Sequence, residues 1–265
     1  MSGAELWALA TREIRRPGWS GRRYAALVTR AARAGSAEAE QALATMRLDG
    51  YRDGQGRVLV RANPKAAARA FARAASAGDV AAAFDIGYCL DVGRGVARDG
   101  RLAMKWYRRA WRVGNPSAAA NIATMYRDRR QLKTAVSWWK RAVAAGGFDE
   151  AVDVGYSYQY GIGVRRDVAS AIRWYRRALR ATYVAEATQE EALYHLAVID
   201  LDRQPARRAH AVALLNRAAK DQDYPEAMAL LAQLRDGRRP VPCRCRRDLR
   251  KSLPGHARCR RHPRR

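Results

Sequence analysis

Apolar residues recur along this chain with the spacing of amphipathic helices. One set of positions i, i+3, i+4 and i+7 consists of Ala83, Ile86, Gly87 and Leu90. A second set with the same spacing consists of Ala103, Trp106, Tyr107 and Ala110. Residues at these intervals share one face of an α-helix, so each segment must bury that face. The pattern predicts two consecutive helices that pack against each other.

This predicted helix pair is repeated along the chain. The segments Phe84–Tyr88 and Trp106–Ala110 return as Val152–Tyr156 and Trp174–Ala178, and a shorter copy occupies 119–142. Weaker copies flank these three, and the small residue near the end of each second helix recurs roughly every 36 residues. Because a single pair cannot hide its apolar stripe, this period predicts an all-α solenoid of about six helix-turn-helix repeats.

Both strong copies join their two helices through the connector Gly-x-Gly-Val-x-x-Asp. It runs from Gly93 to Asp99 in one copy and from Gly161 to Asp167 in the other. Glycine-rich loops that bind phosphate link a strand to a helix, whereas these link two predicted helices. We therefore interpret the glycines as turn residues and the two aspartates as N-caps of the following helices.

These motifs resemble the Sel1-like repeat family, a relative of the tetratricopeptide repeats. The resemblance lies in the Ala-x-x-x-Gly-Tyr of the first helix, the connector, and the Ala-x-x-Trp-Tyr-Arg-Arg-Ala of the second helix. It is specific over 81–182, weaker over 37–80 and 187–236, and partial over 3–35. The resemblance implies a right-handed α-solenoid that acts as an adaptor in protein–protein contacts.

Two regions are predicted from these patterns. Residues 1–236 form the repeat solenoid, and residues 237–265 form a basic, largely irregular tail that begins where the helical spacing ends near Pro240. Within the solenoid, the insertion 50–64 departs from the repeat and predicts a short hairpin arm at 57–60.

The sequence also bears on the cellular compartment in which the protein resides. No segment reaches the ~18–20 consecutive apolar residues of a membrane span. The first residues also lack the apolar core of a secretory signal, and the four cysteines do not form a disulfide framework. We therefore expect a cytoplasmic protein.

The formal net charge of +26 raises the question of a nucleic-acid partner. A basic face is predicted on two of the second helices, at Lys105, Arg108, Arg112, Arg173, Arg176 and Arg180. Surface helices carry charge in any case, so a solvated outer face is the favoured interpretation and a nucleic-acid face is the alternative. Such a charge also favours acidic protein partners.

The tail offers a candidate metal site. It holds twelve Lys and Arg residues against the single acid Asp248. Its candidate Zn²⁺ ligands are Cys243, Cys245, Cys259 and His262. Two thiolates and a Cys/His pair can complete a tetrahedral site, and bound thiolates would offset part of the positive charge. The alternative is an irregular polycation with incidental cysteines, which would bind nucleic acid or an acidic protein loosely.

The inner face of the first helices is the candidate protein-binding surface. Its predicted residues are Asp85, Tyr88, Asn121, Thr124, Asp153, Tyr156, Tyr160 and His195. Acid, amide and tyrosine groups suit a partner that offers hydrogen-bond donors and an apolar surface. The alternative is that these residues only pack one repeat against the next.

Catalytic motifs are not found. His195 and His210 are isolated in helical segments, and the chain contains no nucleophile elbow, Walker loop or zinc-protease motif. The sequence therefore predicts a non-catalytic adaptor that binds proteins through the concave face of its solenoid. The alternative is a nucleic-acid-associated protein that uses the basic faces and the tail. The oligomeric state is left open.

Overall fold

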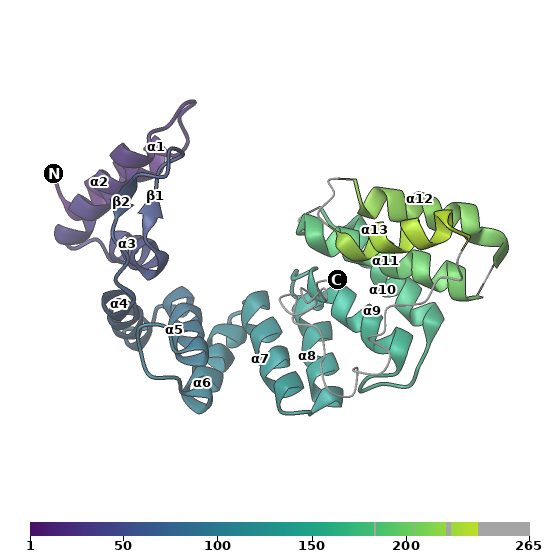
Figure 1. The fold of residues 1–265 in the computed structure, drawn as a ribbon. Coiled ribbons are helices and arrows are strands. Elements are labelled where there is room, and N and C mark those ends of the chain that lie inside the picture. The colour runs from purple at the N-terminus through teal and green to yellow at the C-terminus, as the bar shows by residue number, and fades with distance from the viewer. Residues whose placement is uncertain (183, 204, 221–223, 238–265) are drawn as a thin grey trace. The chain divides into compact units, whose positions relative to one another are not determined.

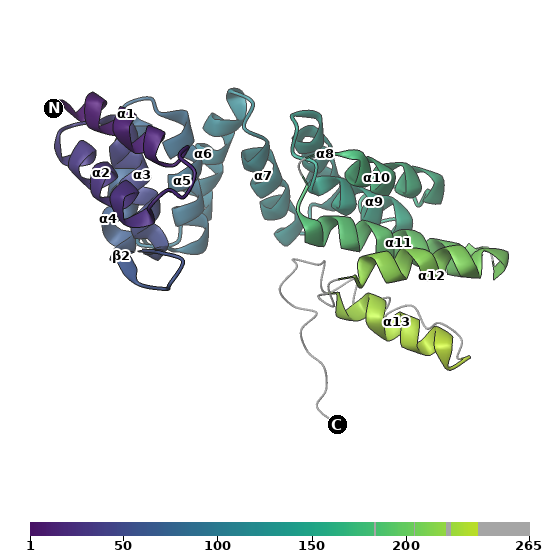
Figure 2. The ribbon, with the colours of Figure 1, turned by 90° about the horizontal axis from the view of Figure 1, so that it is seen from above.

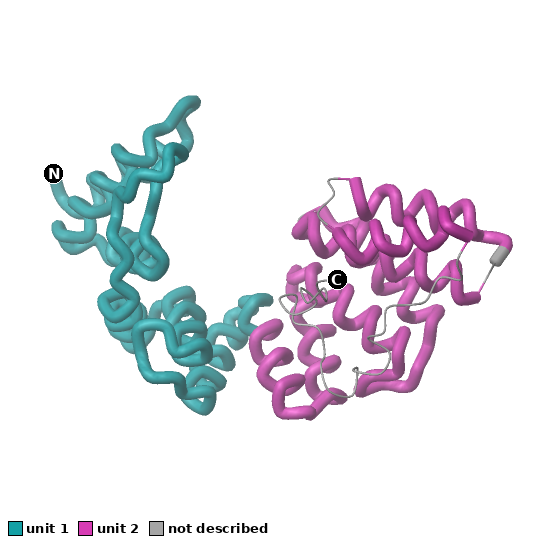
Figure 3. The backbone as a smooth tube through the Cα atoms, in the orientation of Figure 1, with its two compact units in different colours: residues 1–118 teal, residues 119–265 magenta. Residues whose placement is uncertain are grey.

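The computed structural model describes residues 1–182, 184–203, 205–220 and 224–237. Over these residues the fold is all-α, with thirteen α-helices, one short 3₁₀ helix and two very short strands (Figure 1). The chain divides into two compact units, residues 1–118 and 119–265 (Figure 3). The predicted all-α fold class is confirmed.

The first unit is a series of helix pairs. Its helices are α1 (Gly3–Glu13), α2 (Gly21–Arg33), α3 (Ala37–Asp49), α4 (Pro64–Ser76), α5 (Val80–Val92) and α6 (Gly100–Arg112). Helices α1 and α2, α3 and α4, and α5 and α6 pack against each other, and each pair contacts the next. Helix α7 (Pro116–Asp128) spans the boundary at residue 118.

The second unit continues the same organisation. Its elements are α8 (Leu132–Ala144), α9 (Glu150–Tyr160), α10 (Val168–Arg180), α11 (Glu186–Arg203), the 3₁₀ helix η1 (Pro205–Arg207), α12 (Arg208–Ala218) and α13 (Pro225–Arg235) (Figure 2). Each of the helices α8 to α12 packs against the next, and α9 also contacts α11. The first helices of neighbouring repeats therefore meet directly in this unit.

The aromatic pairs of the second helices supply the interior, and their two members play different parts. The second member of each pair, Tyr107, Trp139 or Tyr175, is buried, with Tyr107 and Tyr175 fully so. The first member is partly buried in each case: Trp106, Trp138 and Trp174. Both rings of each aromatic pair were predicted to lie in the interior, but only the second ring is buried there.

The small residue in the first helix makes room for that buried ring. A Cβ atom added at Gly155 of α9 would lie 2.7 Å from Cε1 of Tyr175, closer than side chains pack. At Gly87 of α5 the corresponding distance to Cδ1 of Tyr107 would be 2.9 Å. The glycine is therefore needed because the two helices of a pair approach closely, as the sequence pattern predicts.

The second glycine of the connector has a different role from the first. Gly93 ends α5 with a left-handed backbone, which glycine adopts at little cost. Gly95 also has a positive φ, and a Cβ there would overlap the carbonyl group of Pro64 at the start of α4. Gly163 approaches Leu132 at the start of α8 in the same way. The connector therefore packs against the preceding repeat.

The predicted N-caps are confirmed. Asp99 accepts hydrogen bonds from the backbone N–H groups of Arg101 and Leu102, and Asp167 accepts one from Ser170. The intermediate repeat, which lacks the connector, has Gln131 at this position without a side-chain capping bond. The loss of the motif is thus visible as a loss of one capping interaction.

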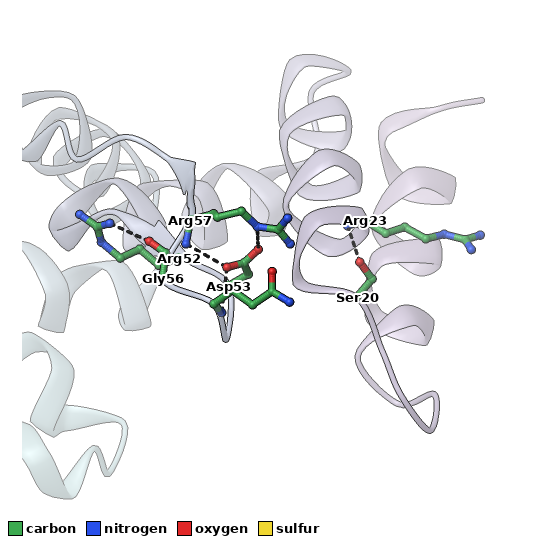
Figure 4. A network of polar contacts seen from close by, with 7 residues as sticks. Ser20, Arg23, Arg52, Asp53, Gly56 and Arg57 are labelled. Carbon is green, nitrogen blue, oxygen red and sulfur yellow. Dashed lines mark hydrogen bonds and ion pairs between the residues drawn. The ribbon is translucent and has the colours of Figure 1, made fainter.

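The insertion 50–64 forms the predicted hairpin. Strand β1 (Tyr51–Arg52) pairs with β2 (Val58–Val60) in antiparallel orientation. In the turn, the Asp53 carboxylate accepts hydrogen bonds from the backbone N–H and the guanidinium of Arg57, at 2.9 and 2.7 Å (Figure 4). The hairpin is thus an insertion in the α3–α4 connection that is held by hydrogen bonds between its own residues.

Candidate functional site

The predicted binding residues all lie on first helices, but they are divided between the two units. Helix α5 of the first unit carries Asp85 and Tyr88. The second unit carries the others: Asn121 and Thr124 on α7, Asp153, Tyr156 and Tyr160 on α9, and His195 on α11. Each unit therefore has its own part of the predicted surface.

In the first unit, the two residues of α5 have different surroundings. Tyr88 is 39% exposed and is available at the surface. Asp85 is partly buried. Burial raises the pKa of its carboxyl, a side-chain hydrogen bond with Gln41 of α3 lowers it, and the nearby Asp79 raises it. The repeat before α5 thus supplies Asp85 with an amide neighbour.

In the second unit, aromatic rings from three helices gather around His195. Its imidazole stacks on the ring of Tyr175, with centroids 5.2 Å apart and an angle of 6° between the planes. Tyr156 meets the imidazole edge-on at 5.3 Å, and Tyr194 does so at 5.4 Å. The ring centroid of Tyr160 lies 4.6 Å from that of Tyr156, which adds a further ring to this group. His195 is only 6% exposed, so it forms the interior of this cluster, beneath the tyrosines.

Carboxyl groups from the same two first helices lie beside these rings. Burial raises the pKa of Asp153 well above its usual range; Glu191 and Glu150 raise it further, while Arg127 of α7 lowers it. Burial also raises the pKa of Glu150, to about 7, with a further contribution from Asp149. An Oε1 atom of Glu191 is 3.7 Å from Nε2 of His195. We call Glu150, Asp153, Glu191, His195 and the rings of Tyr156 and Tyr160 the α9–α11 cluster.

The buried Nδ1 atom of His195 lies inside this cluster and has no hydrogen-bond partner within the described part of the chain. The neighbouring hydroxyl of Tyr175, by contrast, donates to Oε1 of the buried Gln159 at 2.7 Å. Burying a polar nitrogen without a partner costs free energy, so the imidazole is suited to interact with an additional donor or acceptor.

The two residues predicted on α7, Asn121 and Thr124, are partly buried on their helix. Of the predicted set, the ring contacts and charge interactions given above join Asp153, Tyr156, Tyr160 and His195 of α9 and α11.

The predicted basic face is exposed. All six residues, Lys105, Arg108 and Arg112 on α6 and Arg173, Arg176 and Arg180 on α10, lie at the surface. Arg173 donates to Oγ of Ser170 at 2.7 Å and forms an ion pair with Asp167. These side chains can interact with solvent or with an anionic partner.

A second set of arginines explains part of the basic composition structurally. The guanidinium groups of Arg109, Arg141 and Arg177 lie over the rings of Trp106, Trp138 and Trp174, at 5.5, 4.6 and 5.3 Å. The arginine follows the tryptophan by three residues, which places both on one helix face. Each partly buried tryptophan is thus covered by a cation–π contact.

Comparison with known proteins identifies the repeat. The Sel1 repeat profile matches residues 37–79, 80–115, 116–147 and 151–183, which together make up more than half of the chain. The chain belongs to the Sel1 repeat family. The matched segments correspond to the pairs α3–α4, α5–α6, α7–α8 and α9–α10. Sel1 repeat proteins generally mediate protein–protein interactions, and the fold is typically a non-catalytic scaffold.

Solved Sel1 proteins share the fold. A Sel1 repeat protein from Oxalobacter formigenes is 21% identical with a TM-score of 0.67, over 92% of this chain and 94% of that one. The protein c5321 of uropathogenic Escherichia coli, described as a protective antigen with an SLR fold, is 20% identical with a TM-score of 0.56; the match covers 88% of this chain and 57% of that one. No curated protein sequence matches the chain. The shared property is therefore the Sel1 solenoid architecture.

The candidate zinc ligands of the tail, Cys243, Cys245, Cys259 and His262, lie outside the described residues. Within the described ranges, no three His, Cys, Asp or Glu side chains come together as a metal site. Cys89 is buried in α5, and burial raises the pKa of its thiol to about 11, as expected for a packing residue. The described Sel1 helices also include none that is long and apolar enough to cross a membrane.

Sequence reasoning missed four members of the acidic and aromatic neighbourhood: Glu150, Glu191, Tyr175 and Tyr194. Glu191 precedes His195 by four residues, a spacing that places both on one face of α11 and that could have signalled the pair. Tyr175 was expected in the interior, but its stacking on His195 depends on how α10 meets α11. No sequence pattern indicates that contact.

Proposed function

We propose that this Sel1 repeat protein is a non-catalytic scaffold that binds a partner protein through the α9–α11 cluster. The observation that supports this function is the convergence of two first helices on one acidic and aromatic site. Tyr156 and Tyr160 are partly exposed, whereas His195 beneath them is buried, so a partner protein can reach the two tyrosines at the surface of the site. Tyrosine in such a setting is a frequent contributor to binding energy at protein interfaces.

The two units provide a matched pair of variants. Tyr88 of α5 and Tyr156 of α9 occupy the same repeat position, but only Tyr156 belongs to the α9–α11 cluster. Affinity capture from cell extract with identification by mass spectrometry should be performed on the wild-type chain, Tyr88→Ala and Tyr156→Ala. Captures at low and at moderate salt separate charge-driven association from a specific contact, because salt screens exposed charges.

We expect Tyr156→Ala to lose a partner that both the wild-type chain and Tyr88→Ala retain at moderate salt. Far-UV circular dichroism of the two variants should match the wild type. Recovery of the same salt-resistant partners by Tyr156→Ala as by the wild-type chain would contradict the assignment of this site.

Nucleic-acid binding is the second candidate function, and the exposed cations of α6 and α10 favour it. The test is retardation of a random-sequence RNA or DNA duplex by the full chain across a salt series. Replacement of Arg173, Arg176 and Arg180 by alanine should reduce the salt dependence, since each lost phosphate contact removes about one unit of the log–log slope. An unchanged slope would remove this face from the interaction. The cytoplasmic location and the preference for acidic proteins stay predictions.

A further inference from the structure

The α9–α11 cluster is an acidic site in a strongly basic chain. Asp153 of α9 interacts with two further carboxyl groups, those of Glu150 on α9 and Glu191 on α11. Arg127 of α7 lowers the pKa of Asp153, and its guanidinium forms an ion pair with Asp128 at 3.1 Å. Among the described charged groups that bear on Asp153, two are acids and one is a base, so ionisation of the carboxyl groups would concentrate negative charge at this site.

Charge repulsion and desolvation work against such a cluster. Taking ionised carboxyl groups out of water costs free energy, and neighbouring carboxylates repel each other. A positive group inserted among them would relieve both effects at once. The cluster is therefore less stable empty than it would be around a cation.

The buried imidazole provides a second, independent indication. Nδ1 of His195 has no hydrogen-bond partner within the described part of the chain, and the side chain is more than nine-tenths buried. When the neutral ring carries its proton on Nε2, the nitrogen that faces Glu191, Nδ1 accepts a hydrogen bond from an N–H donor. Ammonium and guanidinium groups carry three and five such donors, so either can satisfy this nitrogen.

The surrounding rings match the same kind of ligand. Tyr156 and Tyr160 lie 4.6 Å apart and partly exposed, above an imidazole that stacks on Tyr175. The negative face of an aromatic ring attracts a cation, and several rings together form a cage for an ammonium group. A divalent metal ion fits less well, since the described residues include no group of three ligating side chains.

From this geometry we propose that the α9–α11 cluster binds one lysine or arginine side chain of the partner protein. The carboxyl groups supply the charge, His195 accepts one hydrogen bond, and the partly exposed tyrosine rings pack against the apolar stem of the side chain. The inference rests on the proposed scaffold function, because the partner presents the cation, and it adds the chemical class of what is recognised.

Occupancy should depend on pH. Both Asp153 and Glu150 have raised pKa values, so a bound cation favours their deprotonated forms and binds more tightly as pH rises through about 7. The titratable and charged groups that bear on this site are Asp149, Glu150, Asp153, Tyr156, Tyr160, Tyr175, Glu191, His195 and Arg127.

The direct test uses small molecules that imitate the side chains. The full chain, labelled with ¹³C in its histidine and tyrosine rings, is titrated with n-butylammonium, with n-butylguanidinium and with uncharged 1-pentanol, and followed by NMR at pH 6 and pH 8. We expect saturable shifts of the His195 and Tyr156 ring signals with at least one of the two cations, stronger at pH 8. Shifts that never saturate, or an equal response to 1-pentanol, would overturn the proposal.

Variants locate the site. Asp153→Asn should weaken cation binding by about tenfold, as expected for the loss of one close charge partner. Glu191→Gln, on the neighbouring helix, provides the same test if Asp153→Asn does not fold. The matched control is Glu186→Gln, which removes an exposed carboxylate from the first turn of α11. Affinity that is unchanged in the folded cluster variants, or reduced equally in the control, would contradict the site.

The failure of this inference differs from the failure of the proposed function. If Tyr156→Ala loses its protein partner but the cations do not bind, the scaffold site stands and the recognition of a cationic side chain is wrong. If the cations bind and Asp153→Asn weakens their binding, the cation site is confirmed, even where Tyr156→Ala retains every partner and the proposed interaction site is wrong.

Discussion

The raised pKa of Glu150 makes a quantitative prediction about stability. The carboxyl group lies partly buried in the first turn of α9, and its pKa rises from the ordinary value of 4.5 to about 7, chiefly through burial. A pKa raised in the folded state means that folding favours the protonated acid. The contribution to stability is therefore fully present below pH 4.5 and is lost as pH rises through about 7.

The size of the effect follows from the shift. A change of one pKa unit corresponds to about 1.4 kcal/mol, so this shift corresponds to about 3 kcal/mol between acidic and alkaline conditions. Glutamine keeps the shape of the side chain but cannot ionise. Relative to the wild type, Glu150→Gln should thus be of similar stability near pH 4.5 and more stable by about 2–3 kcal/mol near pH 8.5.

The assay is urea unfolding followed by circular dichroism between pH 4.5 and pH 8.5. The control is Glu186→Gln, which changes a glutamate in the same first-turn position of α11 at an exposed site. Its stability should run parallel to that of the wild type across the range. If the difference between Glu150→Gln and the wild type stays constant with pH, burial does not govern this carboxyl group and the reasoning is refuted.

Three further predictions follow from the repeat geometry and from the tail. Gln131→Asp should stabilise the protein by about 0.5–1 kcal/mol in urea unfolding, because Gln131 makes no side-chain capping bond whereas Asp99 and Asp167 do; an unchanged midpoint would show that the N-terminus of α8 cannot use the cap. Gly155→Ala should destabilise by about 1–2 kcal/mol although alanine favours helix, since the added methyl group meets the fully buried ring of Tyr175; a raised thermal midpoint would contradict this. The purified full chain should carry about one equivalent of zinc by elemental analysis, lost in the Cys243→Ser, Cys245→Ser double variant; a metal content below half an equivalent would end the zinc hypothesis.

Most of the fold could be predicted because the same residue pattern, and with it the same set of contacts, recurs in successive repeats. The apolar stripes, the small residue opposite Tyr107 or Tyr175, and the capping aspartates are all local signals of period 3.6 or of a fixed offset. The position of Trp106, Trp138 and Trp174 was harder to predict. An aromatic pair gives no local indication of which ring faces the interior, and the arginine three residues later is the feature that accompanies the partly buried ring.

The candidate site shows where such prediction ends. Asp85 with Tyr88 and Asp153 with Tyr156 occupy equivalent repeat positions, so the sequence assigns both pairs the same role. Their surroundings differ because a different first helix lies beside each pair. Helix α3 presents Gln41 to Asp85, whereas α11 presents Glu191 and His195 to Asp153 and Tyr156. The distinguishing residues lie in weaker copies of the motif, which the repeat pattern describes less well.

This difference has a consequence for how a Sel1 solenoid acquires a site. The strong motif residues fix the helix spacing and so place an acid and a tyrosine at the same point of the two strong repeats. Whether that point becomes a binding site depends on the helix that faces it. In the first unit the Gln41 amide forms a hydrogen bond with the Asp85 carboxyl, so this partly buried acid has a partner within the protein. In the second unit the facing helix adds a further carboxyl group, that of Glu191, and a buried imidazole nitrogen without a described partner, an arrangement that a cationic ligand would stabilise.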